Sequence, residues 1–243
     1  MRSASRPSAS PRLFPRLPRA LAVLLLAPFI GAPAERLPTS DALRAAGWSK
    51  GGWSGIEPAR FDALPDGGLR VTALAQASFV WRGVEQQGAC LSWRWRVDEG
   101  PPPTPLDRRG GDDRALAITV GFDGWPAESG FMQRTKHALA QVAAGDHRLP
   151  RSMLAYVWGG TGREARPFTN PYAHGLGEVY VLRPADTPTG RWYEEKVELA
   201  RDWSRAFRGA TAPPVMEIMV GTDVDDTNSR LDARIERIRL GPC

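Results

Sequence analysis

The sequence has few of the residues that bind transition metals. Its 243 residues include three histidines and two cysteines. The histidines, His137, His147 and His174, are widely spaced, and neither an H-E-x-x-H nor a C-x-x-C pattern occurs. These absences exclude the common zinc signatures, and we predict no bound cofactor other than a calcium ion considered below.

Long apolar runs are also missing. The longest covers only residues 21–30, whereas a membrane-spanning helix needs about 20 apolar residues. This run follows an acid-free segment with five arginines and precedes Ala32-Pro33-Ala34. The pattern is typical of a secretory signal peptide. We therefore expect residues 1–34 to be a signal peptide and residues 35–243 to form a single secreted or periplasmic domain without a transmembrane span.

The chain has little net charge once that segment is set aside. It contains 32 basic and 27 acidic residues, and five of the basic residues but none of the acidic ones lie in residues 1–34. The rest of the chain is therefore balanced, which argues against nucleic-acid binding. A small molecule or a glycan is the partner that we expect, and the sequence identifies no protein partner.

Helix signals are few. Residues 40–48 begin with a possible N-cap, Ser40, and end at Gly47. Residues 131–145 carry apolar side chains at three- and four-residue spacing before Gly145, as in an amphipathic helix, and residues 202–209 could form one or two turns.

Most of the remaining sequence consists of short apolar segments between Gly, Pro and Asp. In CLSWRWRVD, Trp93 and Trp95 alternate with Arg94 and Arg96, so the two tryptophans are predicted to face the core. We predict a mainly β protein, a jelly-roll-like antiparallel β-sandwich with one or two short helices. The predicted strands are 68–75, 77–84, 90–98, 114–123, 153–160, 177–183, 193–202, 215–223 and 234–240. The proline-rich segment 98–113 is expected to be an exposed loop.

The two cysteines, Cys90 and Cys243, form an even pair, which in an oxidising compartment is a candidate disulfide. Two free thiols are the alternative. The bridge requires Cα atoms within about 7 Å of each other.

An acidic stretch, GTDVDDTNSR, follows the apolar run before residue 221. The EF-hand pattern fails here, because Asn228 stands where glycine is needed and Arg234 where the bidentate acid is needed. An irregular calcium site that uses Asp223 and Asp225, with Asp112 or Asp113, is one interpretation. The other is a polar turn in which Asp and Asn bind their own backbone.

Glu217 is a weak candidate for a catalytic acid. It lies in the run VMEIMV, whose other residues are apolar, so it could be buried and would then need a partner, for which we consider Arg94 and Arg96. Hydrolysis of a glycosidic bond takes two acids about 5–10 Å apart. An acid of the 223–226 segment could be the second.

Tryptophan is abundant, with nine residues. Indole rings stack on the faces of sugars, so a tryptophan-rich secreted sandwich favours carbohydrate binding. Trp125 and Trp158 lie at strand exits beside Gly or Pro, and we expect them to be exposed.

Several segments together resemble a bacterial extracytoplasmic family known as domain of unknown function 3047. The resemblance rests on LSWRWRVD, GDDRALAITVGFD, LAYVWGG, NPYAHG, RWYEEKVELARDW and IMVGTDVDDTNSRLDARIERI. It covers the chain from about residue 45 and implies a jelly-roll-like sandwich. It implies no activity, cofactor or catalytic residue.

The hypothesis from the sequence is a ligand-binding β-sandwich without catalysis, specific for a saccharide or a component of the cell envelope. The alternatives are a polysaccharide-active enzyme, of hydrolase or lyase type, and a structural partner in envelope assembly. The predicted binding residues are Arg94, Arg96, Asp112, Asp113, Asp223, Asp225, Asp226, Trp125 and Trp158.

Overall fold

The structure is a computed structural model that describes residues 34–84, 87–173, 175–209 and 211–243. The predicted signal peptide lies outside the described residues, apart from Ala34. Residues Gly31–Cys243 form one compact unit. Within the described ranges, no helix has both the length and the apolar character needed to cross a membrane.

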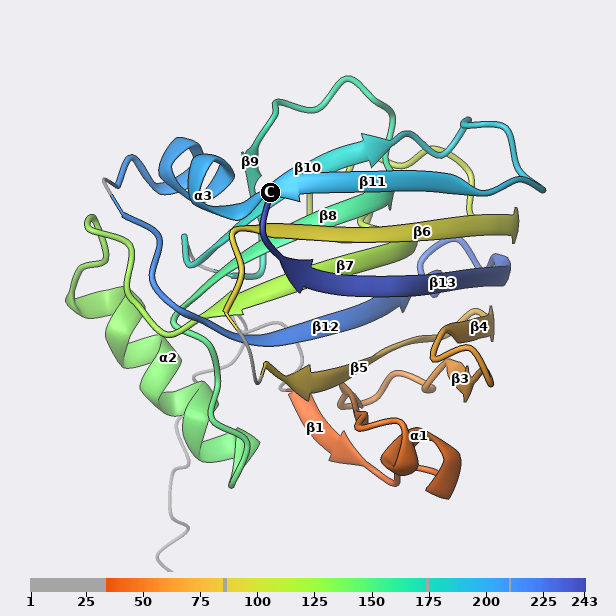
Figure 1. Ribbon diagram of the computed structural model, residues 1–243, viewed down its shortest axis with the longest axis horizontal. Helices are drawn as coiled ribbons and strands as arrows, with labels where there is room; N and C mark the ends of the chain where they lie inside the picture. The colour runs from red at the N-terminus through yellow and green to blue at the C-terminus, as the bar shows by residue number, and fades with distance from the viewer. Residues whose placement is uncertain (1–33, 85–86, 174, 210) are drawn as a thin grey trace, which may run out of the picture. The chain divides into compact units, whose positions relative to one another are not determined.

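Two β-sheets pack face to face in this unit (Figure 1). The eight-stranded sheet has the spatial order β1 (Ala34–Leu37), β2 (Ser49–Trp53), β5 (Ala77–Gly83), β12 (Val215–Asp223), β7 (Arg114–Phe122), β8 (Ser152–Gly159), β10 (Gly177–Arg183) and β9 (Phe168–Thr169). The five-stranded sheet has the order β11 (Tyr193–Glu198), β6 (Cys90–Glu99), β13 (Arg230–Gly241), β4 (Leu69–Leu74) and β3 (Arg60–Ala63). Among these strands β8 and β10 pair in parallel, and the other neighbours are antiparallel. The predicted jelly-roll-like β-sandwich is confirmed.

Every predicted strand is present, and the differences concern short elements. The segment predicted as one strand over 193–202 is β11 followed directly by a helix. Four strands, β1, β2, β3 and β9, were not predicted. They have two to five residues each, too few to show an alternating pattern.

The core between the sheets is rich in aromatic side chains. Trp93 and Trp95 from β6 are 2% and 0% exposed, as predicted. They meet Tyr156 and Trp158 from β8, with ring centroids 5.8 Å apart for Trp93–Tyr156 and 5.7 Å for Trp95–Trp158. The expectation that Trp158 is exposed is wrong, because strand alternation places it on the inner face with Tyr156, and it is 1% exposed.

The described residues form three helices instead of the one or two expected: α1 (Asp41–Ala45), α2 (Phe131–Ala144) and α3 (Leu199–Phe207). Ser40 caps α1, since its hydroxyl accepts a hydrogen bond from the Leu43 amide at 3.3 Å. α3 buries Trp203 and Phe207 against the core. The α2 helix has the predicted range, but its apolar residues face away from the sandwich.

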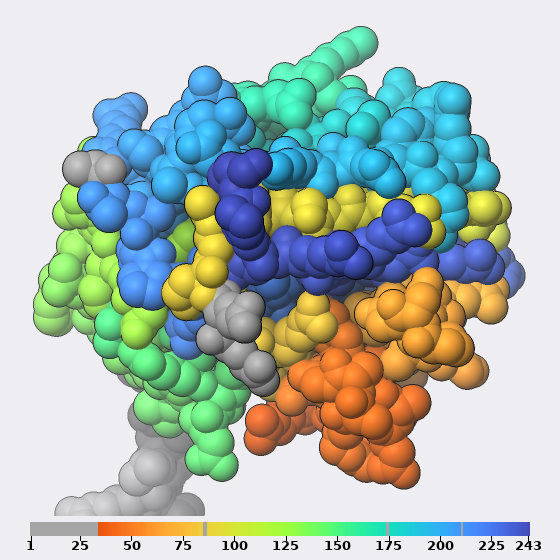
Figure 2. All heavy atoms as spheres, viewed as in Figure 1, coloured from red at the N-terminus to blue at the C-terminus, as the bar shows by residue number. Residues whose placement is uncertain are grey.

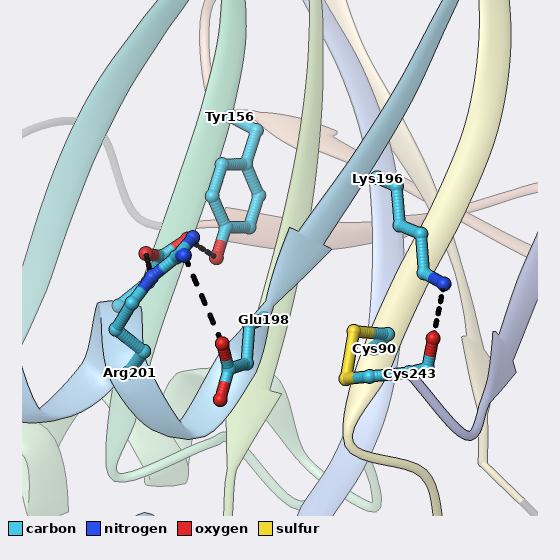
Figure 3. The surroundings of a disulfide bond; sticks show 7 residues. Cys90, Tyr156, Lys196, Glu198, Arg201 and Cys243 are labelled. Carbon is cyan, nitrogen blue, oxygen red and sulfur yellow. Dashed lines mark hydrogen bonds and ion pairs between the residues drawn. A yellow bond between two sulfur atoms is a disulfide. The ribbon is translucent and has the colours of Figure 1, made fainter.

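The chain ends in a disulfide bond between Cys90 and Cys243, as predicted (Figure 3). Their Cα atoms are 5.0 Å apart. Cys90 begins β6, and it lies opposite Gly241 at the end of β13. The Lys196 ammonium also donates a hydrogen bond, at 2.5 Å, to the carbonyl of Cys243. The bond therefore fastens the C-terminus to the five-stranded sheet.

The proline-rich loop after β6 is less exposed than expected. Its Leu106 is 4% exposed. This side chain packs with Phe168 on Ala117, Val157 and Val179, on the outer face of the eight-stranded sheet. The loop thus covers part of that face, because its apolar Leu106 is buried there.

Candidate functional site

The predicted acidic residues come together where β12 ends and β7 begins. β12 occupies a central position in the eight-stranded sheet. Ile218 and Val220 point into the core, so Glu217, Met219, Gly221 and Asp223 lie on the outer face. Asp223 pairs with Arg114 in the register between β12 and β7, which brings Asp112 and Asp113 to the same place.

Asp113 holds the turn that follows β12. It is 0% exposed, and its carboxylate accepts hydrogen bonds from the amides of Asp226 and Thr227 at 3.2 and 2.8 Å. It also accepts one from the Thr227 hydroxyl. The turn is therefore fixed by a residue more than a hundred positions earlier in the chain, in addition to backbone hydrogen bonds within the turn such as that from the Asn228 amide to the Asp225 carbonyl.

Arg114 supplies positive charge to the cluster. Its Nη1 atom lies 3.3 Å from the carboxylates of both Asp112 and Asp223. Burial lowers the pKa of Arg114, but the two carboxylates raise it by more, so it exceeds its ordinary value. The Tyr172 hydroxyl donates to Asp112 at 3.0 Å and accepts from the Gly110 amide at 3.0 Å.

The electrostatic balance of the cluster leaves Asp223 mostly protonated at neutral pH. Burial raises the pKa of Asp223 to about 9; Arg114 opposes the shift, whereas a hydrogen bond with Asp225 and the charge of Asp112 add to it. A neutral carboxyl group can donate a hydrogen bond as well as accept one.

A cation could also be held here. Asp113, Asp223 and Asp225 each offer an oxygen, and these oxygens lie within 4.8 Å of one another. Calcium takes about six to eight oxygen ligands, and both oxygens of Asp113 already accept protein hydrogen bonds. The described side chains supply three ligands, and calcium binding stays a prediction.

The structure does not bring Arg94 and Arg96 to this cluster, and a role for them in ligand binding stays a prediction. Alternation with Trp93 and Trp95 places them on the outer face of the other sheet. Arg94 pairs with Glu236, and Arg96 pairs with Asp98 at 2.6 Å. They were grouped with the acidic residues because they are polar, but each arginine forms its ion pair within its own sheet.

Trp125 lies at the opposite end of β7 from Asp113. The rise per residue of a strand puts the two residues about 25 Å or more apart. It is half-buried, with Arg134 and Arg151 5.4 and 5.9 Å from its ring centroid and with its ring 4.9 Å from His137. It therefore belongs with α2 and not with the acidic turn.

Glu217 is buried, at 3% exposure, as its position in an apolar strand suggested. Its partner is not an arginine: the Nε2 atom of His147 lies 2.7 Å from Oε2 of Glu217, and the His147 ring stacks on Trp81 at 4.3 Å. Glu217 and Asp223 are six positions apart along β12, or about 20 Å. These two acids cannot act together on one glycosidic bond.

A row of aromatic rings on the same outer face escaped the sequence analysis. Trp53, Phe79 and Trp81 have centroids 5.2 and 5.8 Å apart in succession, and Trp53 and Phe79 are half-buried. Phe79 lies across Gly51, where a Cβ would come within 2.6 Å of its ring. The alternation of Phe79 and Trp81 with Ser78 and Val80 is the signal that would have found it.

The aromatic row and the acidic cluster are neighbours. Phe79 pairs with Gly221, and Ala77 pairs with Asp223. Phe79 and Asp223 are therefore diagonal neighbours, with Cα atoms about 7–8 Å apart. One surface thus carries flat apolar rings beside acids, an arginine and a tyrosine hydroxyl.

Residues 47–239 match the model of a family described as protein of unknown function DUF3047. The chain belongs to this family. The match covers every strand except β1 and the last residues of β13, so the acidic cluster and the aromatic row both lie within the DUF3047 region. No curated protein matches the chain.

Three solved structures are similar to the chain at low identity. The endoglucanase cel12A from Rhodothermus marinus is 12% identical with a TM-score of 0.44, over 86% of this chain and 97% of the endoglucanase. The carbohydrate-binding module CBM29_1 from Piromyces equi is 9% identical with a TM-score of 0.31, over 88% and 91%. A loop-swap mutant of Xyn11A from Necallimastix patriciarum is 8% identical with a TM-score of 0.40, over 86% and 94%.

Proposed function

We propose that the protein is a secreted or periplasmic β-sandwich that binds a saccharide or a saccharide component of the cell envelope without catalysis. The observation that carries this proposal is the junction of Trp53 and Phe79 with the acidic cluster on one sheet face. Ring faces stack on the C–H faces of sugars. Carboxylates, guanidinium groups and hydroxyl groups then fix the orientation of the sugar hydroxyls.

The polar groups of this surface are held in place before a ligand binds. The turn that carries Asp225 and Asp226 is held by Asp113. Asp225 is half-buried and Asp226 is exposed, so both can meet a ligand while the inner residue keeps them in place. Holding the binding groups in advance lowers the entropy cost of association.

The test is the affinity of residues Gly31–Cys243, the compact unit, for a panel of soluble polysaccharides, measured by calorimetry. Phe79→Ala and Trp53→Ala should each weaken binding about tenfold, since one aromatic stacking contact contributes roughly 1–1.5 kcal/mol. Trp192→Ala is the matched control, because Trp192 is equally half-buried but lies under Arg94 on the other sheet. Binding that falls equally in the control, or in none of the variants, would contradict the proposal.

A hydrolytic function is the second candidate, and the close approach of Asp113, Asp223 and Asp225 favours it. Glycosidases use a pair of carboxyl groups, and here three carboxyl groups place an oxygen within 4.8 Å of one another. Release of reducing sugar by the wild type, lost in Asp223→Asn and kept in Glu217→Gln, would establish this function. Equal background in all three would exclude it for the polysaccharides tested.

Two other parts of the proposal are tested separately. Export predicts that the protein recovered from outside the cytoplasm begins near Glu35, which N-terminal sequencing would detect. Calcium binding predicts a rise in melting temperature with calcium that a chelator reverses, by an amount equivalent to about 2.7 kcal/mol at a hundredfold excess over Kd. Asp225→Asn should reduce this rise.

A further inference from the structure

The α2 helix presents its apolar side to solvent. Phe131, Met132, Leu139 and Val142 are 84%, 61%, 59% and 82% exposed. At about 100° per residue, these four side chains fall within an arc of about 100°. Isolated exposed apolar residues are ordinary, but a continuous helical stripe of them indicates a surface that is covered by something else.

The opposite side of α2, which faces the sandwich, is polar. Gln133, His137 and Gln141 recur every four residues on it. The ring nitrogen Nε2 of His137 lies 3.0 Å from the Pro150 carbonyl. Gln141 donates to the His147 carbonyl at 2.8 Å and accepts from the Leu149 amide at 2.8 Å. These hydrogen bonds, together with the contacts of His137 and Arg134 with the Trp125 ring, thus fix the helix in an orientation opposite to that of an ordinary surface helix.

The charges of α2 identify what covers the stripe. The helix contains Arg134 and Lys136 and no acid; the nearest acids in sequence, Glu128 and Asp146, lie beyond its two ends. In the same projection, the two basic residues flank the apolar arc on either side. An apolar side with basic residues next to it is the pattern of a helix that lies in the plane of a lipid surface, with the apolar side in the acyl boundary.

We propose that α2 is a membrane-docking helix that binds surfaces rich in anionic lipid. Its 14 residues span about 21 Å, which is enough to lie on a bilayer and too short to cross one. Within the unit Gly31–Cys243 the helix lies at the edge (Figures 1 and 2), as docking on a flat surface requires. The proposal does not depend on saccharide binding, because it rests on a different element.

The test is co-sedimentation of the compact unit Gly31–Cys243 with vesicles of phosphatidylcholine alone or mixed with phosphatidylglycerol. The wild type should bind the anionic vesicles and bind the neutral ones weakly. Combined Phe131→Gln, Leu139→Gln and Val142→Gln substitutions should lower the partition coefficient at least tenfold. Leu74→Gln, which removes another exposed apolar side chain (54% exposed), is the matched control and should bind like the wild type.

A charge variant, Arg134→Gln with Lys136→Gln, should weaken binding to anionic vesicles about thirtyfold, because each of the two basic residues near a charged membrane contributes about 1 kcal/mol. Near-ultraviolet circular dichroism checks that every variant is folded. Wild-type protein that stays in the supernatant, or a triple variant that still sediments, would overturn the proposal. A dimer detected by light scattering and abolished in the triple variant, with no vesicle binding, would assign the stripe to a second copy of the chain instead.

Discussion

Removal of the Cys90–Cys243 disulfide should lower the free energy of unfolding by about 4 kcal/mol. The bond closes a loop of 153 residues. The loop-entropy relation for a segment of this length gives about 5 kcal/mol at 25 °C, and measured losses for native disulfides are about 2–5 kcal/mol. In the folded chain, Gly241 already pairs with Cys90 in the sheet. The bond therefore acts mainly by restricting the unfolded chain.

The substitution to use is Cys90→Ala with Cys243→Ser, which leaves no thiol to form intermolecular bonds. Cys90 is buried and Cys243 is exposed, so alanine and serine suit the two positions. Urea unfolding followed by tryptophan fluorescence gives the free energy, and the variant should also show a larger m-value, because its unfolded state is less compact. Reductant should bring the wild type to the stability of the variant and leave the variant unchanged. A difference below about 1 kcal/mol would refute the entropic reasoning.

Three further predictions concern the outer face of the eight-stranded sheet. Asp113→Ala should lower the free energy of unfolding by about 3 kcal/mol, since it removes a buried charged acceptor of several hydrogen bonds. Hydrogen exchange at the Thr227 amide should accelerate, and unchanged exchange would mean that the turn is stable without Asp113. The folded-state pKa of Asp223 is about 9 against about 3.9 unfolded, so stability contributed by this group falls as pH rises through that window. The free energy of unfolding of Asp223→Asn should therefore rise relative to that of the wild type between about pH 5 and pH 8, by at most about 1.4 kcal/mol per pH unit. Urea unfolding with chelator present measures this difference. Glu217→Gln keeps a hydrogen-bonding atom near His147 and should cost less than about 1 kcal/mol, whereas Glu217→Ala should cost at least twice as much; equal melting temperatures for the two would refute a role for this contact.

The sequence predicted the parts of this fold that repeat locally. Alternation in CLSWRWRVD identified the strand β6 and the inward direction of Trp93 and Trp95. Turn residues bounded most of the other strands. The even number of cysteines predicted a candidate disulfide, with two free thiols as the alternative, and the structure contains the disulfide. Trp158 was the exception in the core: its neighbouring glycines suggested exposure, but the strand continues through it and keeps the alternation.

Contacts between distant segments could not be predicted in this way. His147 and Glu217 are 70 residues apart, and Asp113 and Thr227 are 114 apart. No local pattern records such a pairing, because it depends on which strands become neighbours. The orientation of α2 shows the same limit. Its apolar stripe predicts a helix, but periodicity does not tell whether the stripe meets the core or another surface.

The acidic turn after β12 need not be either a structural element or a binding site alone. Asp113 is fully buried and uses both carboxylate oxygens to hold the turn. Asp223 is engaged with Arg114. Asp225 and Asp226 are the more accessible residues, and they lie at the end of the strand that runs beside Phe79. The inner acids thus fix the position of the outer ones next to an aromatic surface, and this division favours a ligand that combines flat apolar faces with hydroxyl groups.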